Sequence, residues 1–238
     1  MIEHKNKVEL LDYMGSDNSH ALAAWSSTYL ELDLDMPNEI GNRVDFIVQH
    51  ILANSSRIRN VEELLTFLST EGHTSPFRFS MFHFAMTHDI ATHIHLLKHM
   101  VAIYADNAES ARYKILKQDK FYIPYDWTGT EVRDYWAKIL HESSMLNIAL
   151  YKQCYDELVA DGMNKQRAKE TSRYFLMYNT QLNDMKMMSF DGFLQVYNKR
   201  NLLSPAQREV GVAVELMLDL IKNIPGNPFK YSLKAFNL

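Results

Sequence analysis

An α+β fold is predicted for this chain, mostly helical with a small sheet, in one domain of residues 1–238. Helical periodicity recurs along most of the chain, whereas alternating apolar runs are few and short. The 238 residues, 47% of them hydrophobic and 23% charged, are enough to bury a large core. No internal repeat, low-complexity tract or clear linker divides them. These observations together favour one globular α+β domain.

The N-terminal part is predicted to form one strand and then several helices. The apolar-rich run "KVELLDYM", residues 7–14, stops at "GSDNS", which is typical of a strand followed by a turn. Asn18 or Ser19 is expected to cap a helix through "HALAAWSSTYLEL". A second helix is predicted in "RVDFIVQHILANS". A third is predicted in "NVEELLTFLSTEG", with Asn60 as its N-cap and Gly72 as its stop.

The middle of the chain changes its pattern from helical to alternating. The run "SPFRFSMFHFAM", residues 75–86, alternates at period two and predicts a strand that is buried on at least one face. Asp89 is expected to cap a helix over residues 90–104. The segment "KILKQDKFYIPYDWTG" is predicted to be a loop because it contains Pro124 and Gly129.

The C-terminal part is predicted to be mainly helical. Residues 131–160 are expected to form one long helix, and residues 165–177 a second. The segment "YNTQLNDM" is ambiguous. A last helix is predicted in "SPAQREVGVAVELMLDLIKNIPG", with Pro205 in its first turn and Pro225 at its end.

Composition excludes several classes of protein. The formal net charge of -4 gives no basic field for a nucleic-acid partner, although a few local cations suffice for a small anion. The one cysteine, Cys154, excludes a disulfide scaffold, and its helical context predicts a small buried residue. The N-terminal residues lack a signal-peptide pattern, and no apolar stretch is long enough for a membrane span. We therefore expect a cytoplasmic protein with no membrane partner.

Five of the ten histidines lie in the first eighteen residues of segment 82–113: His83, His88, His93, His95 and His99. His95 and His99 share a helix face, but Lys98 lies between them and no HExxH motif is present. We expect no metal site here, and a histidine-based metal enzyme remains the less favoured alternative. His83, His88 and His93 are expected to be mainly structural.

The end of the same segment gathers groups that suit a phosphate. Lys98, His99, Ser110 and Arg112 lie within fifteen residues, on a predicted helix end and the loop after it. Cationic and hydroxyl donors near a helix end can hold an anion. Asn107 is a candidate for hydrogen bonds to a base or to the edge of a flavin.

Several segments resemble, in order and spacing, those of the flavin-dependent thymidylate synthases. "GHTSPFRFSMFHF" is similar to that family's "GHxTPFEHxxFxF" without a gap, and "LLKHMVAIYADNAESARY" to its RHR signature followed by S-x-N-E-x-S-x-R-Y. "DKFYIP" resembles its "FYIP", "QLNDMKMMSF" its "xVNARSLMNF", and "PAQREV" its "HAQWEI". The resemblance spans about residues 7–215.

This resemblance implies an α+β homotetramer with sites between subunits that hold FAD and a pyrimidine deoxynucleotide monophosphate. In the family, methylenetetrahydrofolate donates the carbon and NADPH the reducing power that convert dUMP to dTMP. No enzyme cysteine attacks the uracil ring, which agrees with the absence of a convincing nucleophilic cysteine in this sequence.

The resemblance also assigns roles to single residues. Flavin contacts are expected at His73, Ser75, Lys98, His99, Asn107 and Asn183. Nucleotide contacts are expected at His95, Glu109, Ser110, Arg112 and Lys169. Catalytic roles are expected at His99, Ser110 and Arg200, with Arg200 as our candidate for the arginine that faces the uracil edge.

The chain departs from the family signature at both of its arginines, where it has Lys98 and Met100. Ala108 stands where the family has Glu, and Glu109 is one residue away. Arg78 and Phe79 replace a Glu-His pair. These changes leave alternatives open: hydroxymethylation of dUMP or dCMP, in which water traps the carbon on C5, or a non-catalytic nucleotide-binding paralogue.

Overall fold

The computed structural model describes residues 5–31, 33–55, 58–99, 102–110, 115–116 and 120–238. Its α-helices are α1 (Asp17–Trp25), α2 (Arg43–Asn54), α3 (Val61–Thr70), α4 (Ile90–Leu97), α5 (Glu131–Ala160), α6 (Lys165–Ser172), α7 (Phe190–Arg200), α8 (Arg208–Lys222) and α9 (Lys230–Ala235). Short 3-10 helices are η1 (Ile40–Asn42), η2 (Ser75–Arg78) and η3 (Arg173–Phe175). The strands are β1 (Lys7–Met14), β2 (Met81–Asp89), β3 (Ile103–Ala108) and β4 (Gln181–Met188). The predicted α+β class, mostly helical with a small sheet, is therefore confirmed.

The sheet has four strands in the described part of the chain, in the order β1-β2-β4-β3. The chain divides into two compact units. Unit 1 is Met1–Val8, Ala85–Lys98 and Asp106–Met185, and unit 2 is Glu9–Phe84, His99–Ala105 and Lys186–Leu238. Each of the four strands therefore has one end in each unit. The expectation of a single domain stays a prediction.

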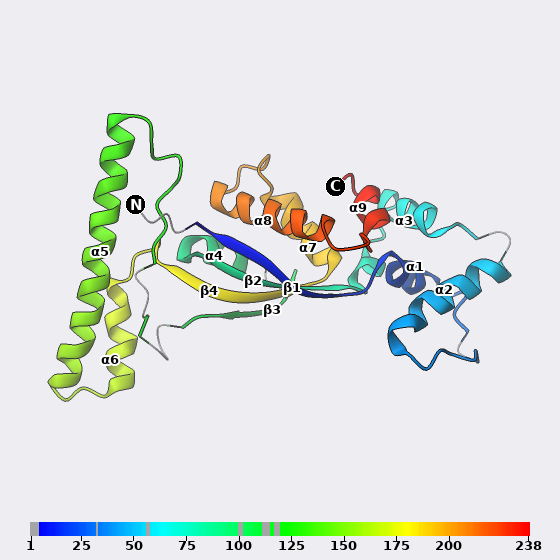
Figure 1. Ribbon diagram of the computed structural model, residues 1–238, viewed down its shortest axis with the longest axis horizontal. Coiled ribbons are helices and arrows are strands. Elements are labelled where there is room, and N and C mark those ends of the chain that lie inside the picture. Colours follow the sequence, from blue (N-terminus) through cyan, green and yellow to red (C-terminus); the bar gives the residue numbers. More distant parts are fainter. Residues whose placement is uncertain (1–4, 32, 56–57, 100–101, 111–114, 117–119) are drawn as a thin grey trace. The chain divides into compact units, whose positions relative to one another are not determined.

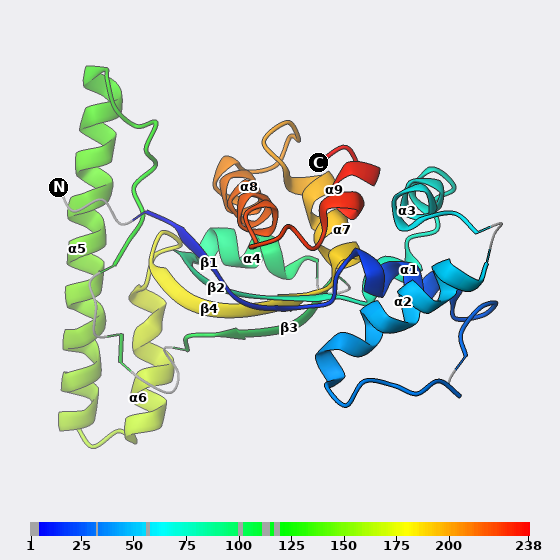
Figure 2. The same cartoon turned by 45° about the vertical axis from the view of Figure 1, so that its right-hand side comes forward.

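Unit 1 contains the long helix α5 with α6 packed beside it (Figures 1 and 2). On α5, Tyr151 is fully buried, and its hydroxyl accepts a hydrogen bond from the Leu116 N–H at 3.1 Å. The Asn179 side chain donates to the Ser144 hydroxyl at 2.9 Å and to the Tyr122 carbonyl at 3.0 Å. These bonds hold the loops before α5 and β4 against the helix.

Unit 2 is built around a cluster of buried aromatic rings. Phe77, Phe82, Phe190 and Phe229 are fully buried, and the His20 ring packs against three of them. α1, α3 and α9 pack together in this unit, as do α7 and α8. The core of unit 2 therefore contains a histidine as well as apolar side chains.

Many predicted elements are confirmed. β1 covers the predicted residues 7–14, and α5 covers the predicted residues 131–160. Asn60 caps α3 by accepting from the Glu63 N–H at 2.9 Å, and Asp89 caps α4 by accepting from the Thr92 N–H at 2.9 Å. Gly72 has a left-handed φ of 72°, as its predicted role after the helix requires.

The first helix begins earlier than predicted. Its cap is Ser16, not Asn18 or Ser19, and Ser16 and Ser19 exchange hydrogen bonds in a capping box. It ends at Trp25, so the predicted extension is wrong for residues 26–31, and residue 32 lies outside the described residues.

The helix predicted over residues 90–104 ends at Leu97 and is followed by β3. Half of the residues of β3 are exposed, and the strand does not alternate between apolar and polar residues, so it carries no period-two signal. The strand predicted over residues 75–86 starts only at Met81, because Pro76 lies in the short helix η2.

In the C-terminal part, β4 begins at Gln181, inside the ambiguous segment. Of the helix predicted over residues 165–177, residues 165–175 form α6 and η3. Pro205 precedes α8 instead of lying in its first turn. α7 and α9 were not predicted.

Candidate functional site

Two residues that the sequence places 101 positions apart lie in direct contact. The Nε of Arg200, the last residue of α7, donates to Nε2 of His99 at 2.9 Å. Both side chains are half-buried, and both residues belong to unit 2. The structure thus brings together two of the three predicted catalytic residues.

The surroundings of His99 favour its neutral form. Burial lowers the pKa of His99 below its ordinary value, and the positive charges of Arg200 and Lys199 lower it further. A neutral imidazole that accepts at Nε2 carries its proton on Nδ1. His99 can therefore offer one N–H donor at Nδ1 while Arg200 holds the ring in place.

A second contact joins a predicted flavin residue to a predicted nucleotide residue in unit 1. Oε2 of Glu109 accepts from both the backbone N–H and the side-chain amide of Asn183, each at 3.3 Å. The Glu109 N–H donates to the Asn183 carbonyl at 2.7 Å, and the Thr87 hydroxyl donates to Asn183 Oδ1 at 2.8 Å. The exposed Asn183 amide is therefore held in one orientation on β4.

The first segment of the family resemblance lies at η2 in unit 2. His73 and Ser75 are exposed there, so their polar side chains face solvent. Arg78, which stands where the family has Glu, pairs with the buried carboxylate of Asp191 at 2.8 Å. This ion pair joins η2 to the first turn of α7, the helix that ends at Arg200.

The remaining predicted residues lie in unit 1. His95 is half-buried on α4, and Lys98 is exposed just after it. Asn107 is exposed on β3, whereas Ser110 and Lys169 are half-buried. Arg112 and Met100 lie outside the described residues. The anion site was predicted on a helix end and a loop, but β3 lies between Lys98 and Ser110.

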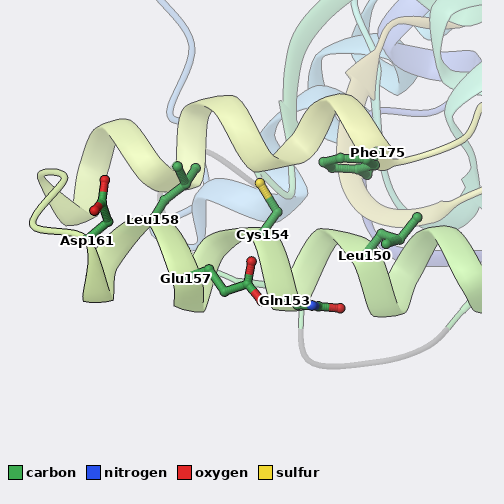
Figure 3. Close-up of a pocket in the computed structure, with 7 residues that line it drawn as sticks. All are labelled: Leu150, Gln153, Cys154, Glu157, Leu158, Asp161 and Phe175. Carbon is green, nitrogen blue, oxygen red and sulfur yellow. Dashed lines mark hydrogen bonds between the residues drawn. The ribbon is translucent and has the colours of Figure 1, made fainter.

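A groove at Cys154, on α5 and η3, is lined by none of the predicted site residues (Figure 3). It has a volume of about 400 Å³ and is lined by Leu150, Gln153, Cys154, Glu157, Leu158, Asp161 and Phe175. Cys154 is half-buried, so the prediction of a buried side chain is wrong. The charged side chains that line the groove, Glu157 and Asp161, are both acidic, which does not suit a nucleotide phosphate.

Within the described residues, no helix combines the length and the apolar character that a membrane span requires.

Sequence comparison identifies close matches over most of the chain. The family described as thymidylate synthase complementing protein matches residues 9–225. Flavin-dependent thymidylate synthases from two strains of Tropheryma whipplei, TW08/27 and Twist, are 31% identical over 182 residues. The alignments cover 68% of this chain and 70% and 69% of those two proteins.

Structural comparison finds the same fold in a solved enzyme. Crystal structures of a UMP/dUMP methylase, PolB from Streptomyces cacaoi, match with TM-scores of 0.73 for the complex with 5-Br dUMP and 0.69 for that with 5-Br UMP. Both are 20% identical to this chain and cover 99% of it, and the match covers 96% and 95% of those chains.

Proposed function

Because the chain belongs to the flavin-dependent thymidylate synthase family, whose members are C5 methyltransferase-like enzymes, we propose that it converts dUMP to dTMP. In this proposal a one-carbon unit passes from methylenetetrahydrofolate to C5 of the pyrimidine, with FAD as cofactor and NADPH as reductant. The enzyme class and the dependence on flavin and folate follow from the family. The choice of nucleotide, product and reductant is the proposed part.

The observation that carries the proposal is the pairing of His99 with Arg200. Arg200 donates to His99 through Nε and to the Lys199 carbonyl through one terminal nitrogen at 3.4 Å, so its other terminal nitrogen can donate to another group. The neutral imidazole offers a further donor at Nδ1. A uracil ring has two carbonyl oxygens, and these fixed donors suit their recognition.

The residues at the predicted flavin positions fit FAD by their chemistry. His73, Ser75 and Asn183 are exposed side chains that can donate or accept hydrogen bonds, as the polar edge of a flavin ring requires. The Asn183 amide is already oriented by Glu109 and Thr87. Bound in its reduced form, the flavin would supply the reducing equivalents that turn the transferred carbon into a methyl group.

The phosphate of the nucleotide is assigned to Arg112, with Lys169 and the Ser110 hydroxyl. Phosphate monoesters carry close to two negative charges at neutral pH, so a fixed guanidinium is the strongest single partner available. We further propose a cytoplasmic homotetramer with sites between subunits.

The proposal is tested by assaying the purified protein with dUMP, methylenetetrahydrofolate, FAD and NADPH. We expect a product that is heavier than dUMP by one methylene unit, and we expect it to disappear when either folate or flavin is omitted. A protein that binds dUMP and FAD but forms no product would contradict the proposal.

A second candidate reaction is hydroxymethylation of dUMP or dCMP. The replacement of both signature arginines by Lys98 and Met100 favours it, because changed groups beside the flavin alter whether water or hydride reaches the transferred carbon. Mass spectrometry separates the outcomes, since the 5-hydroxymethyl product carries one more oxygen than the methyl product. Parallel assays with dCMP identify the base.

A further inference from the structure

Two histidines and one aspartate form a buried cluster that the proposed function does not use. Oδ2 of Asp184 lies 2.7 Å from Nε2 of His88 and 2.9 Å from Nδ1 of His93. The side chains of His88 and Asp184 are fully buried, and that of His93 is 11% exposed. We call these three residues the His–Asp–His cluster.

The cluster is held by three regular elements of unit 1. His88 lies at the end of β2, and Asp184 lies on β4, its neighbour in the sheet. His93 lies in the first turns of α4, where Asp89 caps the helix through the Thr92 N–H and hydroxyl. Side chains on such elements keep their donor atoms close together, which a binding site requires.

Imidazole and carboxylate groups that are buried together are ligand types of a transition-metal ion. A buried carboxylate is costly unless hydrogen bonds or a cation compensate its charge. Nδ1 of His88 is buried and makes no hydrogen bond within the part of the chain that the structure describes. The cluster therefore contains an imidazole that its protein neighbours there do not fully satisfy.

We propose that the His–Asp–His cluster binds one divalent transition-metal ion, with Zn²⁺ as the best-suited ion. Two imidazoles and one carboxylate form an established zinc ligand set, and the cluster offers one ligand atom from each residue, all within 4.8 Å of one another. Ligand atoms of one zinc ion lie about 3 to 3.5 Å apart, so the ion needs only a small widening of the present contacts. When the metal binds, the ring proton that now faces Asp184 moves to the other nitrogen of each imidazole, so both histidine ligands stay neutral.

The surroundings of His93 support this assignment. Its other ring nitrogen, Nε2, lies 4.0 Å from Oδ2 of Asp106, a carboxylate that is itself only 10% exposed. A carboxylate behind a ligating histidine fixes the ring and raises its basicity. The two carboxylates would also balance the charge of a divalent ion. We assign the ion a structural role, joining the start of α4 to β2 and β4.

This site differs from the one considered in the sequence. The expectation of no metal covered all five histidines of segment 82–113, including His88 and His93. It was argued from the spacing of His95 and His99, and neither of these belongs to the cluster. Asp184, which stands where the quoted family segment "xVNARSLMNF" has alanine, was not recognised as a candidate ligand. Its partners lie 96 and 91 residues away, so no local motif points to it.

The test is zinc binding by the full-length protein after removal of metal with a chelator. We expect calorimetry and elemental analysis to show one Zn²⁺ per chain in the parent. Asp184→Asn and His93→Gln should each weaken binding at least tenfold. His83→Gln is the matched control, because His83 lies on β2 in the alternate register, opposite to the buried positions that include His88.

A second readout separates a specific site from non-specific uptake and does not depend on the variants folding. Zn²⁺ should raise the thermal midpoint of the chelator-treated parent, because a ligand that binds only the folded state stabilises it. Co²⁺ in its place should give visible absorption bands of a nitrogen- and oxygen-ligated ion. The proposal is overturned if the parent binds no Zn²⁺, if Asp184→Asn binds it as tightly as the parent, or if His83→Gln abolishes binding. FAD and dUMP binding are measured separately, so failure here leaves the proposed function untouched.

Discussion

His99 and Arg200 show which features of a site can be predicted from single residues of the sequence and which cannot. His99 was found through its family signature, whereas Arg200 was a candidate for a family arginine that has no ungapped equivalent in this sequence. Nothing in the sequence indicates that Arg200 donates to His99, because the contact depends on where α7 ends relative to β3. Glu109 was similarly proposed for the nucleotide, whereas in the structure it accepts from Asn183. Their functional roles stay predictions.

The first prediction concerns the pKa of His99. Burial is the main cause of its lowering, followed by Arg200 and then Lys199. Arg200→Gln should therefore raise the His99 pKa, and Lys199→Gln should raise it less, while burial keeps both values below the ordinary one. NMR titration of the imidazole signals measures the His99 pKa in the parent protein and in both variants. A larger effect of Lys199→Gln would contradict this order.

The second prediction concerns Arg112, assigned to the phosphate. Arg112→Ala should weaken dUMP binding by about 2–5 kcal/mol if the ion pair is desolvated. Arg112→Lys should weaken it less, because the charge remains while the bidentate geometry is lost. FAD binding, measured by absorption, serves as the control and should change little. Calorimetric titration that finds unchanged dUMP affinity in Arg112→Ala would remove the phosphate role.

At the scale of elements, the sequence predicts a helix correctly where its capping residue and its apolar periodicity indicate the same bounds. α5 was predicted with its full bounds, and Asn60 and Asp89 cap the helices they were expected to cap. The failures have physical causes. β3 is a half-exposed strand whose residues do not alternate between apolar and polar. The buried positions of β4 include Lys186, a charged residue that composition alone assigns to the surface.

The third prediction concerns the packing of α7. A Cβ on Gly192 would lie 2.2 Å from the carbonyl oxygen of Ala102, a backbone atom that cannot move aside. Gly192→Ala should therefore destabilise the protein by about 1–3 kcal/mol, although alanine is otherwise the better helix residue. Gly41→Ala is the control, since its Cβ would meet nothing within 4 Å. Chemical denaturation measures the free energy of unfolding of both variants. Equal values for Gly192→Ala and Gly41→Ala would contradict the predicted clash.

At the scale of the whole molecule, stability depends on a buried histidine. The Ser232 hydroxyl donates to Asp17 at 2.5 Å and lies 2.8 Å from Nδ1 of His20, so His20 donates there. Nε2 of His20 is then an acceptor for the Ser80 hydroxyl at 2.9 Å. The neutral ring satisfies all these partners, and burial lowers the pKa of His20 to about 3.

The fourth prediction follows from this pKa. The unfolded chain takes up a proton at His20 below its ordinary pKa of 6.5, whereas the folded chain does so only near pH 3. Stability should therefore be fully present above pH 6.5 and fall between 6.5 and 3, by about 1.4 kcal/mol per pH unit. His20→Gln should flatten this decline in urea denaturation series.

Asp17 serves as a control, because its contribution to stability changes with pH in the opposite direction to that of His20. Burial raises the pKa of Asp17 despite its hydrogen bonds, so its protonation favours the folded state as the pH falls. Asp17→Asn should remove that compensation and steepen the loss of stability below neutral pH. An unchanged slope in both variants would show that this network does not control acid unfolding.

The fifth prediction concerns assembly. We expect four chains of 27.8 kDa each in one particle, which sedimentation or light scattering measures directly. Added FAD should co-migrate with that particle and give it a flavin absorption band. A colourless single-chain species that takes up no FAD would contradict the proposed assembly and cofactor together.

The division of the chain between its two compact units has a consequence for its inheritance. The chain crosses from one unit to the other at five points, after residues 8, 84, 98, 105 and 185. No single break in the coding sequence can separate the units, and no single recombination event can exchange one of them for a homologous piece while sparing the other. A homologous exchange that replaces the whole of one unit therefore also replaces residues of the other.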